Sequence, residues 1–169
     1  MAQSSFTTQL LPSLSSKIGI LQLNNPASLN ALTLDMVRSM SATLRAWQGA
    51  PIRATLLLGT SRDEGAAARP VFCAGGDVKA VYLAGQAGDA ALTADFFREE
   101  YRLNHQIATQ PPHMPQVSVW DGVVMGGGVG VSVHGKYRVA TENTVFAMPG
   151  KVQLGTSSVS RVHHARSWS

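Results

Sequence analysis

The chain has 169 residues, of which 44% are hydrophobic and 14% charged, a composition that allows one globular domain with a buried core. It contains no run of about eighteen apolar residues, so no membrane partner is expected, and its single cysteine, Cys73, excludes an intramolecular disulfide. The net charge is +4, but residues 1–150 carry 11 basic and 10 acidic side chains. This nearly neutral body argues against a nucleic-acid partner, since Lys151, Arg161 and Arg166 carry the excess.

Residues 1–16 are rich in Ser and Thr and contain no acidic residue. We interpret them as a flexible N-terminus, with a weak organelle signal as the alternative. No linker or repeat divides the segment that follows, and residues 17–149 are expected to form one domain.

Strand and helix patterns alternate along this domain. Short apolar runs that end in turn residues predict strands over 17–25, 53–59 and 116–122, and the strand over 53–59 is expected to be buried on both faces. Apolar residues at helical spacing predict helices over 34–47, with Thr33 as N-cap, and over 92–107. This alternation predicts an α/β domain.

Two glycine clusters each follow an extended segment and precede a helical one. "FCAGGDVKAVY" contains Gly75 and Gly76 before Asp77, a candidate helix cap, and "VMGGGVG" contains three consecutive glycines at 126–128. Backbone N–H groups at such turns can bind an anion or a developing oxyanion if the two turns converge. The alternative is that each cluster is only a tight turn; neither has the spacing of a phosphate-binding fingerprint.

Four segments together carry a family resemblance: "NNPASLNALTLDMV", "FCAGGDVKAVY", "FFREEYRLN" and "MGGGVGVSVHGKYRVATENTVFAMP". Over residues 17–149 the chain resembles the crotonase, or enoyl-CoA hydratase/isomerase, superfamily, and within it the 3-hydroxyisobutyryl-CoA hydrolase branch. The resemblance implies a spiral of ββα units that binds an acyl-CoA substrate, with coenzyme A as part of that substrate and no separate cofactor. It also implies a mitochondrial location, a role in valine breakdown and a tendency to form homo-oligomers.

Carried over by position, the resemblance assigns the oxyanion-hole N–H groups to Gly76 and Gly127, and a substrate contact to Glu100. The residues alone favour a solvated helix residue beside Arg98 and Glu99, and it is the resemblance that favours a substrate contact instead. The remaining polar candidates have simpler structural interpretations. Cys73 is expected to be a small buried residue. The histidines at 105 and 113 are expected on a helix surface and in a loop, His134 is expected to be a turn or packing residue, and no metal site is expected at 163–164.

The carboxylates of the hydrolase branch have no counterpart in this sequence. The resemblance places a Glu directly after Met148-Pro149 and an Asp eight positions later, but Gly150 and Ser158 stand there. A hydratase would carry a further Glu where this chain has Gly130. We therefore expect a domain truncated after the MP dipeptide, with an incomplete spiral, a divergent and disordered tail over 150–169, and doubtful activity. The alternatives are a non-catalytic acyl-CoA-binding module, a truncation product, or an enoyl-CoA hydratase/isomerase.

Overall fold

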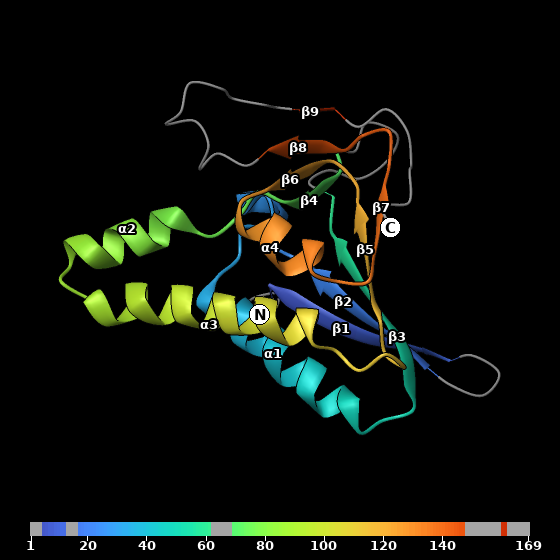
Figure 1. Ribbon diagram of the computed structural model, residues 1–169. Coiled ribbons are helices and arrows are strands. Elements are labelled where there is room, and N and C mark those ends of the chain that lie inside the picture. Colours follow the sequence, from blue (N-terminus) through green and yellow to red (C-terminus); the bar gives the residue numbers. More distant parts are fainter. Residues whose placement is uncertain (1–4, 13–16, 62–68, 148–159, 162–169) are drawn as a thin grey trace.

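The computed structural model describes residues 5–12, 17–61, 69–147 and 160–161, which form two β-sheets and their covering helices (Figure 1). The larger sheet has the order β1-β2-β3-β5-β7. Its strands are Phe6–Pro12, Lys17–Leu23, Ile52–Gly59, Gln116–Trp120 and Tyr137–Ala140. All neighbouring strands are parallel except β1, which runs antiparallel to β2 at one edge.

The smaller sheet has the order β4-β6-β8-β9. Its strands are Val71–Cys73, Val123–Met125, Val145–Ala147 and Ser160–Arg161. The first three are parallel to one another, and β9 pairs antiparallel with β8. The β4–β6 pair is the part of this sheet on which the candidate site is built.

The helices are the short 3-10 helix Pro26–Ser28, α1 over Leu34–Gln48, α2 over Val78–Gln86, α3 over Ala90–Ala108 and α4 over Gly127–Val133. Three of the helices, α1, α2 and α3, begin at a residue whose side chain caps them. The side chains of Thr33, Asp77 and Asp89 accept hydrogen bonds from the backbone N–H groups of Met36, Ala80 and Leu92, respectively. Both predicted long helices are confirmed, each with its end shifted by no more than two residues.

The chain winds as a spiral of strand, strand and helix. β3 in the larger sheet is followed by β4 in the smaller sheet and then by α2 and α3; β5, β6 and α4 repeat this path, and β7 and β8 begin it again. Figure 1 shows the smaller sheet above the larger one, with α4 beside α3 and the α2–α3 pair projecting from the body. The predicted α/β spiral of ββα units is therefore confirmed.

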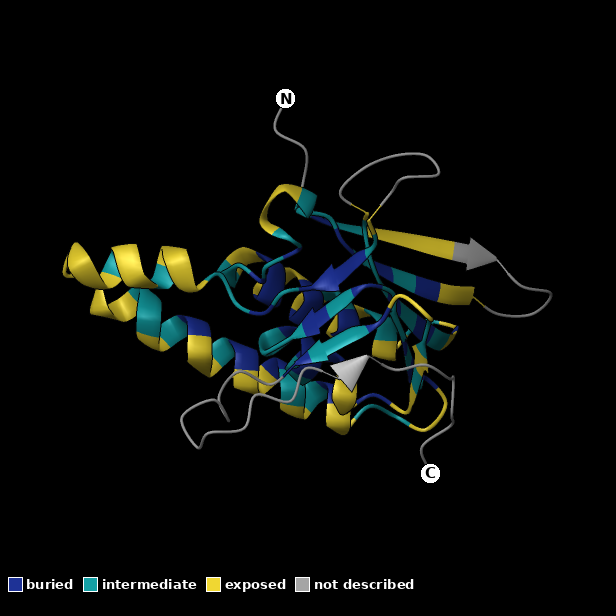
Figure 2. Ribbon diagram, turned by 90° about the horizontal axis from the view of Figure 1, so that it is seen from above, coloured by how far each residue is buried: buried dark blue, intermediate teal, exposed yellow. Residues whose placement is uncertain are grey.

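The hydrophobic core lies between the sheets and α1, α3 and α4. Its fully buried side chains include Leu21, Leu32, Met36, Leu57, Phe72, Leu103 and Val131. In Figure 2 the buried faces of α1 and α3 turn toward this core, whereas α2 is largely exposed. The face of α3 that turns toward the core carries the apolar stripe Phe96, Leu103 and Ile107, whose side chains are all buried.

Three expectations need correction. Residues 6–12 are not a flexible terminus, because their backbone pairs with β2 and the Phe6 side chain joins the core. β3 is not buried on both faces: Ile52, Thr55 and Leu57 are buried, while the residues between them are exposed or half-buried. Within the expected disordered tail, residues 160–161 form β9 on the edge of β8, and the rest of 150–169 lies outside the described residues.

Candidate active site

The two glycine clusters lie side by side because β4 and β6 are neighbouring parallel strands. Val71 pairs with Val123 and Cys73 with Val124, so both strands end at the same edge of the smaller sheet. The carboxyl ends of parallel strands are where α/β folds place ligands. The glycine segments that follow these two strands therefore lie close together. Such proximity is the condition under which both turns could bind one oxyanion.

Left-handed glycines set the two turns. Gly75 has φ +113° and Gly126 has φ +46°, conformations that side-chain-bearing residues rarely adopt. A Cβ atom on Gly127 would overlap Glu100 Oε1 and lie 3.3 Å from the Gly76 backbone nitrogen. Glycine at position 127 thus lets the two backbones and the carboxylate approach one another.

The N–H groups of Gly76 and Gly127 are free of protein acceptors in the part of the chain that the structure describes. Leu32 N–H donates to the Gly75 carbonyl at 2.7 Å, and Asp77 N–H donates to the Leu32 carbonyl at 2.9 Å. These bonds hold the turn on both sides of Gly76 and leave its own N–H unused. Gly127 is the first residue of α4, where N–H groups have no partner within the helix.

Glu100 reaches this point from α3. Its side chain is only 7% exposed, and it forms no hydrogen bond or ion pair with the described residues. Burial raises its pKa above the usual value, because water no longer stabilises the charged form. A neutral carboxyl group can donate one hydrogen bond, whereas the ionised group can only accept. The solvated-helix interpretation of Glu100 is therefore wrong, since the side chain is buried against Gly127.

Asn30 is a supporting residue that the sequence patterns did not single out. It is fully buried and left-handed, with φ 54°, and its side-chain nitrogen donates to the carbonyls of Thr60 at 2.9 Å and Val71 at 2.8 Å. Its side-chain oxygen accepts the Asn25 backbone N–H at 2.8 Å. These bonds fix the 25–32 segment that holds Gly75. An Asn inside "NPASLN" is a recognisable turn signal, but its long-range partners are not visible in sequence.

Cys73 is buried, as expected. It is 0% exposed and its thiol donates to the Asn30 carbonyl at 3.1 Å. Burial, with a smaller contribution from the nearby negative charge of Glu100, raises the pKa of this thiol to about 12. A thiol with this pKa is not a nucleophile at neutral pH.

Position 130 faces Asn104, not an open space for a carboxylate. A Cβ atom on Gly130 would lie 2.8 Å from Asn104 Nδ2, one turn along α3 from Glu100. Asn104 Oδ1 is buried without a hydrogen-bond partner among the described residues. The side chain of Asn104 thus occupies the volume beside α4 into which a residue larger than glycine would project.

A groove of 310 Å³ adjoins the glycine turns. Its wall includes Leu34 and Arg38 of α1, Phe96 of α3, and the N-cap residues Thr33 and Asp77 of α1 and α2. Phe96 also contacts Gly76, since a Cβ atom there would lie 2.9 Å from its ring. An extended ligand could therefore reach Gly76 along these helices.

Other polar residues are not drawn into this site. His105 and His134 are exposed on α3 and at the end of α4, and His113 is exposed in a turn, as expected. Gly150 and Ser158, together with residues 163–164, lie outside the described residues. Among those described, no three His, Cys, Asp or Glu side chains are grouped to hold a metal ion, and none of their helices is long and apolar enough to cross a membrane.

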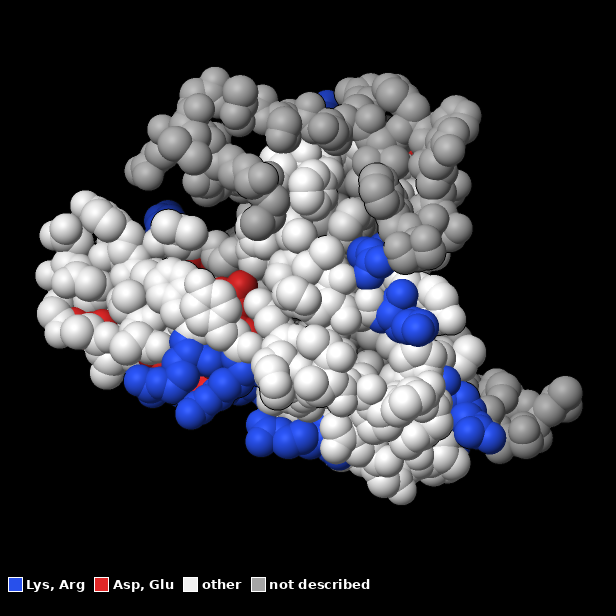
Figure 3. Space-filling model, viewed as in Figure 1, with Lys and Arg blue, Asp and Glu red and all other residues white. Residues whose placement is uncertain are grey.

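Basic side chains gather along the α1–α3 edge of the molecule in Figure 3. They are partly balanced by carboxylates. Asp95 contacts Arg38 at 3.4 Å and Arg98 at 2.6 Å, and Glu99 contacts Arg102 at 3.1 Å. These charged side chains therefore lie on the outer face of α3. The side chain of Glu100, the residue after Glu99, is buried instead.

Comparison with known proteins decides the family. A family model described as "Enoyl-CoA hydratase/isomerase" matches residues 18–157. The chain belongs to the enoyl-CoA hydratase/isomerase family. Similar solved structures of this family include an enoyl-CoA hydratase from Rhodobacter sphaeroides, with TM-score 0.71 and 35% identity over 86% of this chain and 40% of that one. A carnitinyl-CoA dehydratase from Mycobacterium thermoresistibile matches with TM-score 0.71 and 43% identity over 84% of this chain and 38% of that one.

Curated relatives within the enoyl-CoA hydratase/isomerase family carry one recurring name. The mitochondrial 3-hydroxyisobutyryl-CoA hydrolase of Gallus gallus is 47% identical over 131 residues, or 78% of this chain and 32% of the relative. A probable 3-hydroxyisobutyryl-CoA hydrolase of Arabidopsis thaliana is 45% identical over 143 residues, or 84% of this chain and 35% of the relative. The chain thus spans about a third of the length of the curated relatives it matches.

Proposed function

We propose that this chain binds the thioester carbonyl of an acyl-CoA, with the N–H groups of Gly76 and Gly127 as its two hydrogen-bond donors. The observation that carries the proposal is that these two donors are adjacent and lack protein acceptors among the described residues. An oxygen between them would accept both hydrogen bonds. Such a pair stabilises a developing oxyanion by about 3 kcal/mol per donor.

The substrate class that we infer is a 3-hydroxyacyl-CoA, with 3-hydroxyisobutyryl-CoA as the first candidate and valine breakdown in the mitochondrion as the setting. The names of the curated relatives support this choice. Glu100 is the residue that we assign to substrate contact, because its carboxyl group lies against Gly127 without a partner of its own among the described residues. Such a group can bond to a substrate hydroxyl in either protonation state.

A hydratase is the alternative enzyme, and residue 130 argues against it. A hydratase needs a second carboxylate near the bound acyl group, but position 130 is glycine and Asn104 lies against it. Hydrolysis also needs a group that activates water. Since Gly150 and Ser158 supply no carboxylate, we propose that the 169-residue chain binds acyl-CoA without hydrolysing it.

The test is calorimetric titration of the 169-residue chain with 3-hydroxyisobutyryl-CoA and with free coenzyme A. We expect the thioester to bind about thirtyfold more tightly, since two hydrogen bonds to its carbonyl each contribute about 1 kcal/mol. Gly127→Ala should abolish this preference, because the added methyl group enters the space between Glu100 and Gly76. Gly85→Ala is the matched control, since nothing lies within 4 Å of its added methyl group. Equal affinity for both ligands would contradict the proposed site.

Hydrolysis is followed in parallel by release of the free coenzyme A thiol. No release above the uncatalysed rate is expected from this chain. If the unmodified chain hydrolysed the thioester and the Gly127→Ala variant did not, the proposed binding site would stand. The conclusion that Gly150 and Ser158 leave the chain inactive would be wrong.

A further inference from the structure

β7 forms one edge of the larger sheet. It pairs with β5 on one side, and the structure describes no strand on its other side. Thr141, the residue after β7, donates its N–H to the Trp120 carbonyl of β5 at 3.0 Å. Because consecutive residues of a strand turn their backbone groups to opposite sides, those of Arg138 and Ala140 point away from β5. They have no backbone partner among the described residues, and such an edge can pair with another strand.

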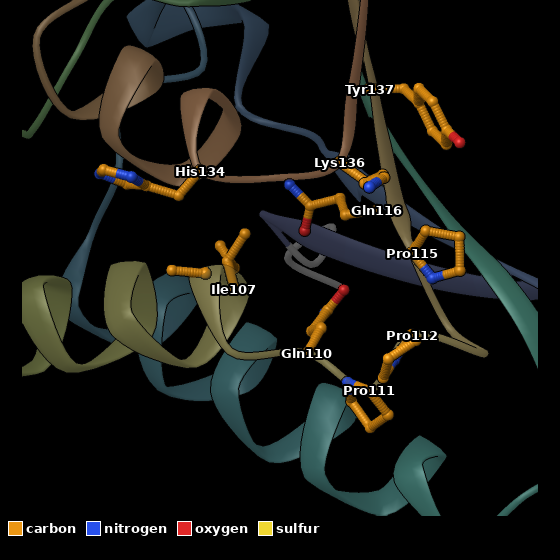
Figure 4. Close-up of a pocket in the computed structure, with 10 residues that line it drawn as sticks. Ile107, Gln110, Pro111, Pro112, Pro115, Gln116, His134, Lys136 and Tyr137 are labelled. Atoms are coloured by element: carbon orange, nitrogen blue, oxygen red, sulfur yellow. The ribbon is translucent and has the colours of Figure 1, made fainter. Parts of the chain in front are cut away.

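The exposed side chains of β7 are apolar. Tyr137 is 54% exposed and Val139 is 45% exposed, and alternate residues of a strand share one face. In Figure 4 the Tyr137 ring points away from α3 and α4. Arg138, between these two residues, is turned back, since its guanidinium donates to the carbonyls of Val133 at 2.8 Å and Gly135 at 2.7 Å. The edge therefore combines free backbone groups with apolar surface.

The opposite edge of the sheet differs from β7. β1 has the sequence FTTQLLP, which contains no charged residue and ends in a proline that lacks an N–H group. An uncharged strand offers no charge pair that would fix one register with a partner. β7, in contrast, lies between Lys136 and Glu142, which are both exposed. These opposite charges on the two sides of β7 suit a strand that carries the same pattern in the reverse direction.

We propose that β7 pairs antiparallel with β7 of a second copy of this chain. A two-fold axis at Val139 places Arg138 of each copy opposite Ala140 of the other, so their outward backbone groups exchange hydrogen bonds. Val139 then lies opposite Val139 of the second copy. At both ends of the pairing, Lys136 of one copy lies opposite Glu142 of the other, which adds an attraction between opposite charges.

Other registers of the same pairing are less favourable. An axis at Tyr137 would place Lys136 opposite Arg138, and an axis at Arg138 would place that residue opposite itself, so both would oppose positive charges. An axis at Ala140 would pair Arg138 with residue 142, which lies in a turn and not in the strand. The axis at Val139 is the one that keeps the paired residues within β7 and opposes unlike charges.

A dimer of this kind is closed by its two-fold axis, because each copy uses its β7 edge once. The paired strands are only four residues long. An interface of this size is smaller than that of a permanent complex, so the dimer should dissociate on dilution. The pairing uses the larger sheet, whereas Gly76 and Gly127 follow strands of the smaller sheet. Its test therefore does not involve acyl-CoA binding.

The experiment is sedimentation velocity of the 169-residue chain from about 5 to about 500 µM, a range over which a weak dimer forms by mass action. We expect the mass to rise toward that of two copies. Val139→Lys should keep the chain monomeric, because it brings two positive charges together at the axis. Leu10→Lys is the matched control on β1, since Leu10 is 43% exposed, and should dimerise like wild type.

Three results of this experiment would overturn the proposal. They are a wild-type chain that stays monomeric, as it would if residues of the same chain covered β7, association beyond two copies, and a dimer that Val139→Lys leaves intact. Thermal melts of Val139→Lys establish that the variant is folded. Its melting temperature should match that of wild type at low concentration, because the substituted side chain is exposed.

Two further sets of variants test the register. Val139→Cys should form a disulfide between copies under mild oxidation, because Cα atoms of such a directly opposed pair are about 4.5 Å apart. Leu10→Cys should not, and the natural thiol of Cys73 is fully buried. Lys136→Glu and Glu142→Lys should each weaken the dimer severalfold, whereas the two changes together should restore it. A dimer in which Val139→Cys does not cross-link, or which the double variant fails to restore, would contradict this pairing.

Discussion

Replacing Glu100 with Gln tests the electrostatics of the candidate active site most directly. The change keeps the shape of the side chain and removes its charge. Because Glu100 is only 7% exposed as a residue and its carboxyl has no cationic or hydrogen-bonding partner among the described residues, its ionised form destabilises the folded chain. We therefore expect Glu100→Gln to stabilise the protein at neutral pH.

The sign and size follow from the raised pKa. Between the ordinary carboxyl pKa of 4.5 and the higher pKa of the folded state, the folded chain holds more protons than the unfolded chain. Stability therefore falls as pH rises through this window, and the full cost remains above it. Each unit of pKa difference is about 1.4 kcal/mol, which for a chain of this length raises the melting temperature of the variant by roughly 3–5 °C.

Thermal melts of wild type and Glu100→Gln at pH 7 and at pH 4 measure this effect. The variant should melt higher at pH 7, and the difference should nearly vanish at pH 4, where Glu100 is mostly protonated in the unfolded state and more completely so in the folded state. Glu99→Gln is the control on the same helix, since Glu99 contacts Arg102 at the surface and its loss should be neutral or slightly destabilising. A Glu100→Gln variant that is less stable than wild type at pH 7 would refute the reasoning.

Three further outcomes are expected. Asn30→Ala should lower the free energy of unfolding by roughly 3 kcal/mol in urea titrations, because two carbonyls and one N–H lose their partner; a loss below about 1 kcal/mol would contradict this. The Cys73 thiol, with pKa about 12, should resist iodoacetamide in the native chain at pH 8 and react after unfolding; rapid native labelling would disprove its burial. Ser132→Ala should cost about 1–2 kcal/mol, measured in the same way, because Trp120 Nε1 donates to this hydroxyl at 2.9 Å; an unchanged stability would contradict that role.

Local patterns predicted most of the elements correctly. The helix caps Thr33 and Asp77 could be identified from sequence because each bonds to a backbone N–H only three residues further along the chain. β1 could not be predicted in the same way, since "FTTQLLP" gains its order only from pairing with β2. Strand propensity without a known partner says little about such an edge strand.

The site residues were predictable in part. Gly76, Gly127 and Glu100 were selected by resemblance, and the structure brings all three together. Asn30 and Asn104 were missed as site neighbours because their roles depend on contacts between segments far apart in the sequence. The roles of the three selected residues in binding remain predictions that the titrations above address.

The pairing of β4 with β6 also has a kinetic consequence. Most of the backbone that separates Gly76 from Gly127 consists of α2, α3 and β5, so their meeting is a long-range contact. Contacts of this kind form late, because closing a long loop costs entropy before any stabilising contact repays it. The β2–α1–β3 unit can form from nearby segments, whereas the paired N–H groups exist only after the second turn of the spiral has docked. Acyl-CoA binding would then be the last property that the folding chain acquires, and recovery of binding would report completed folding.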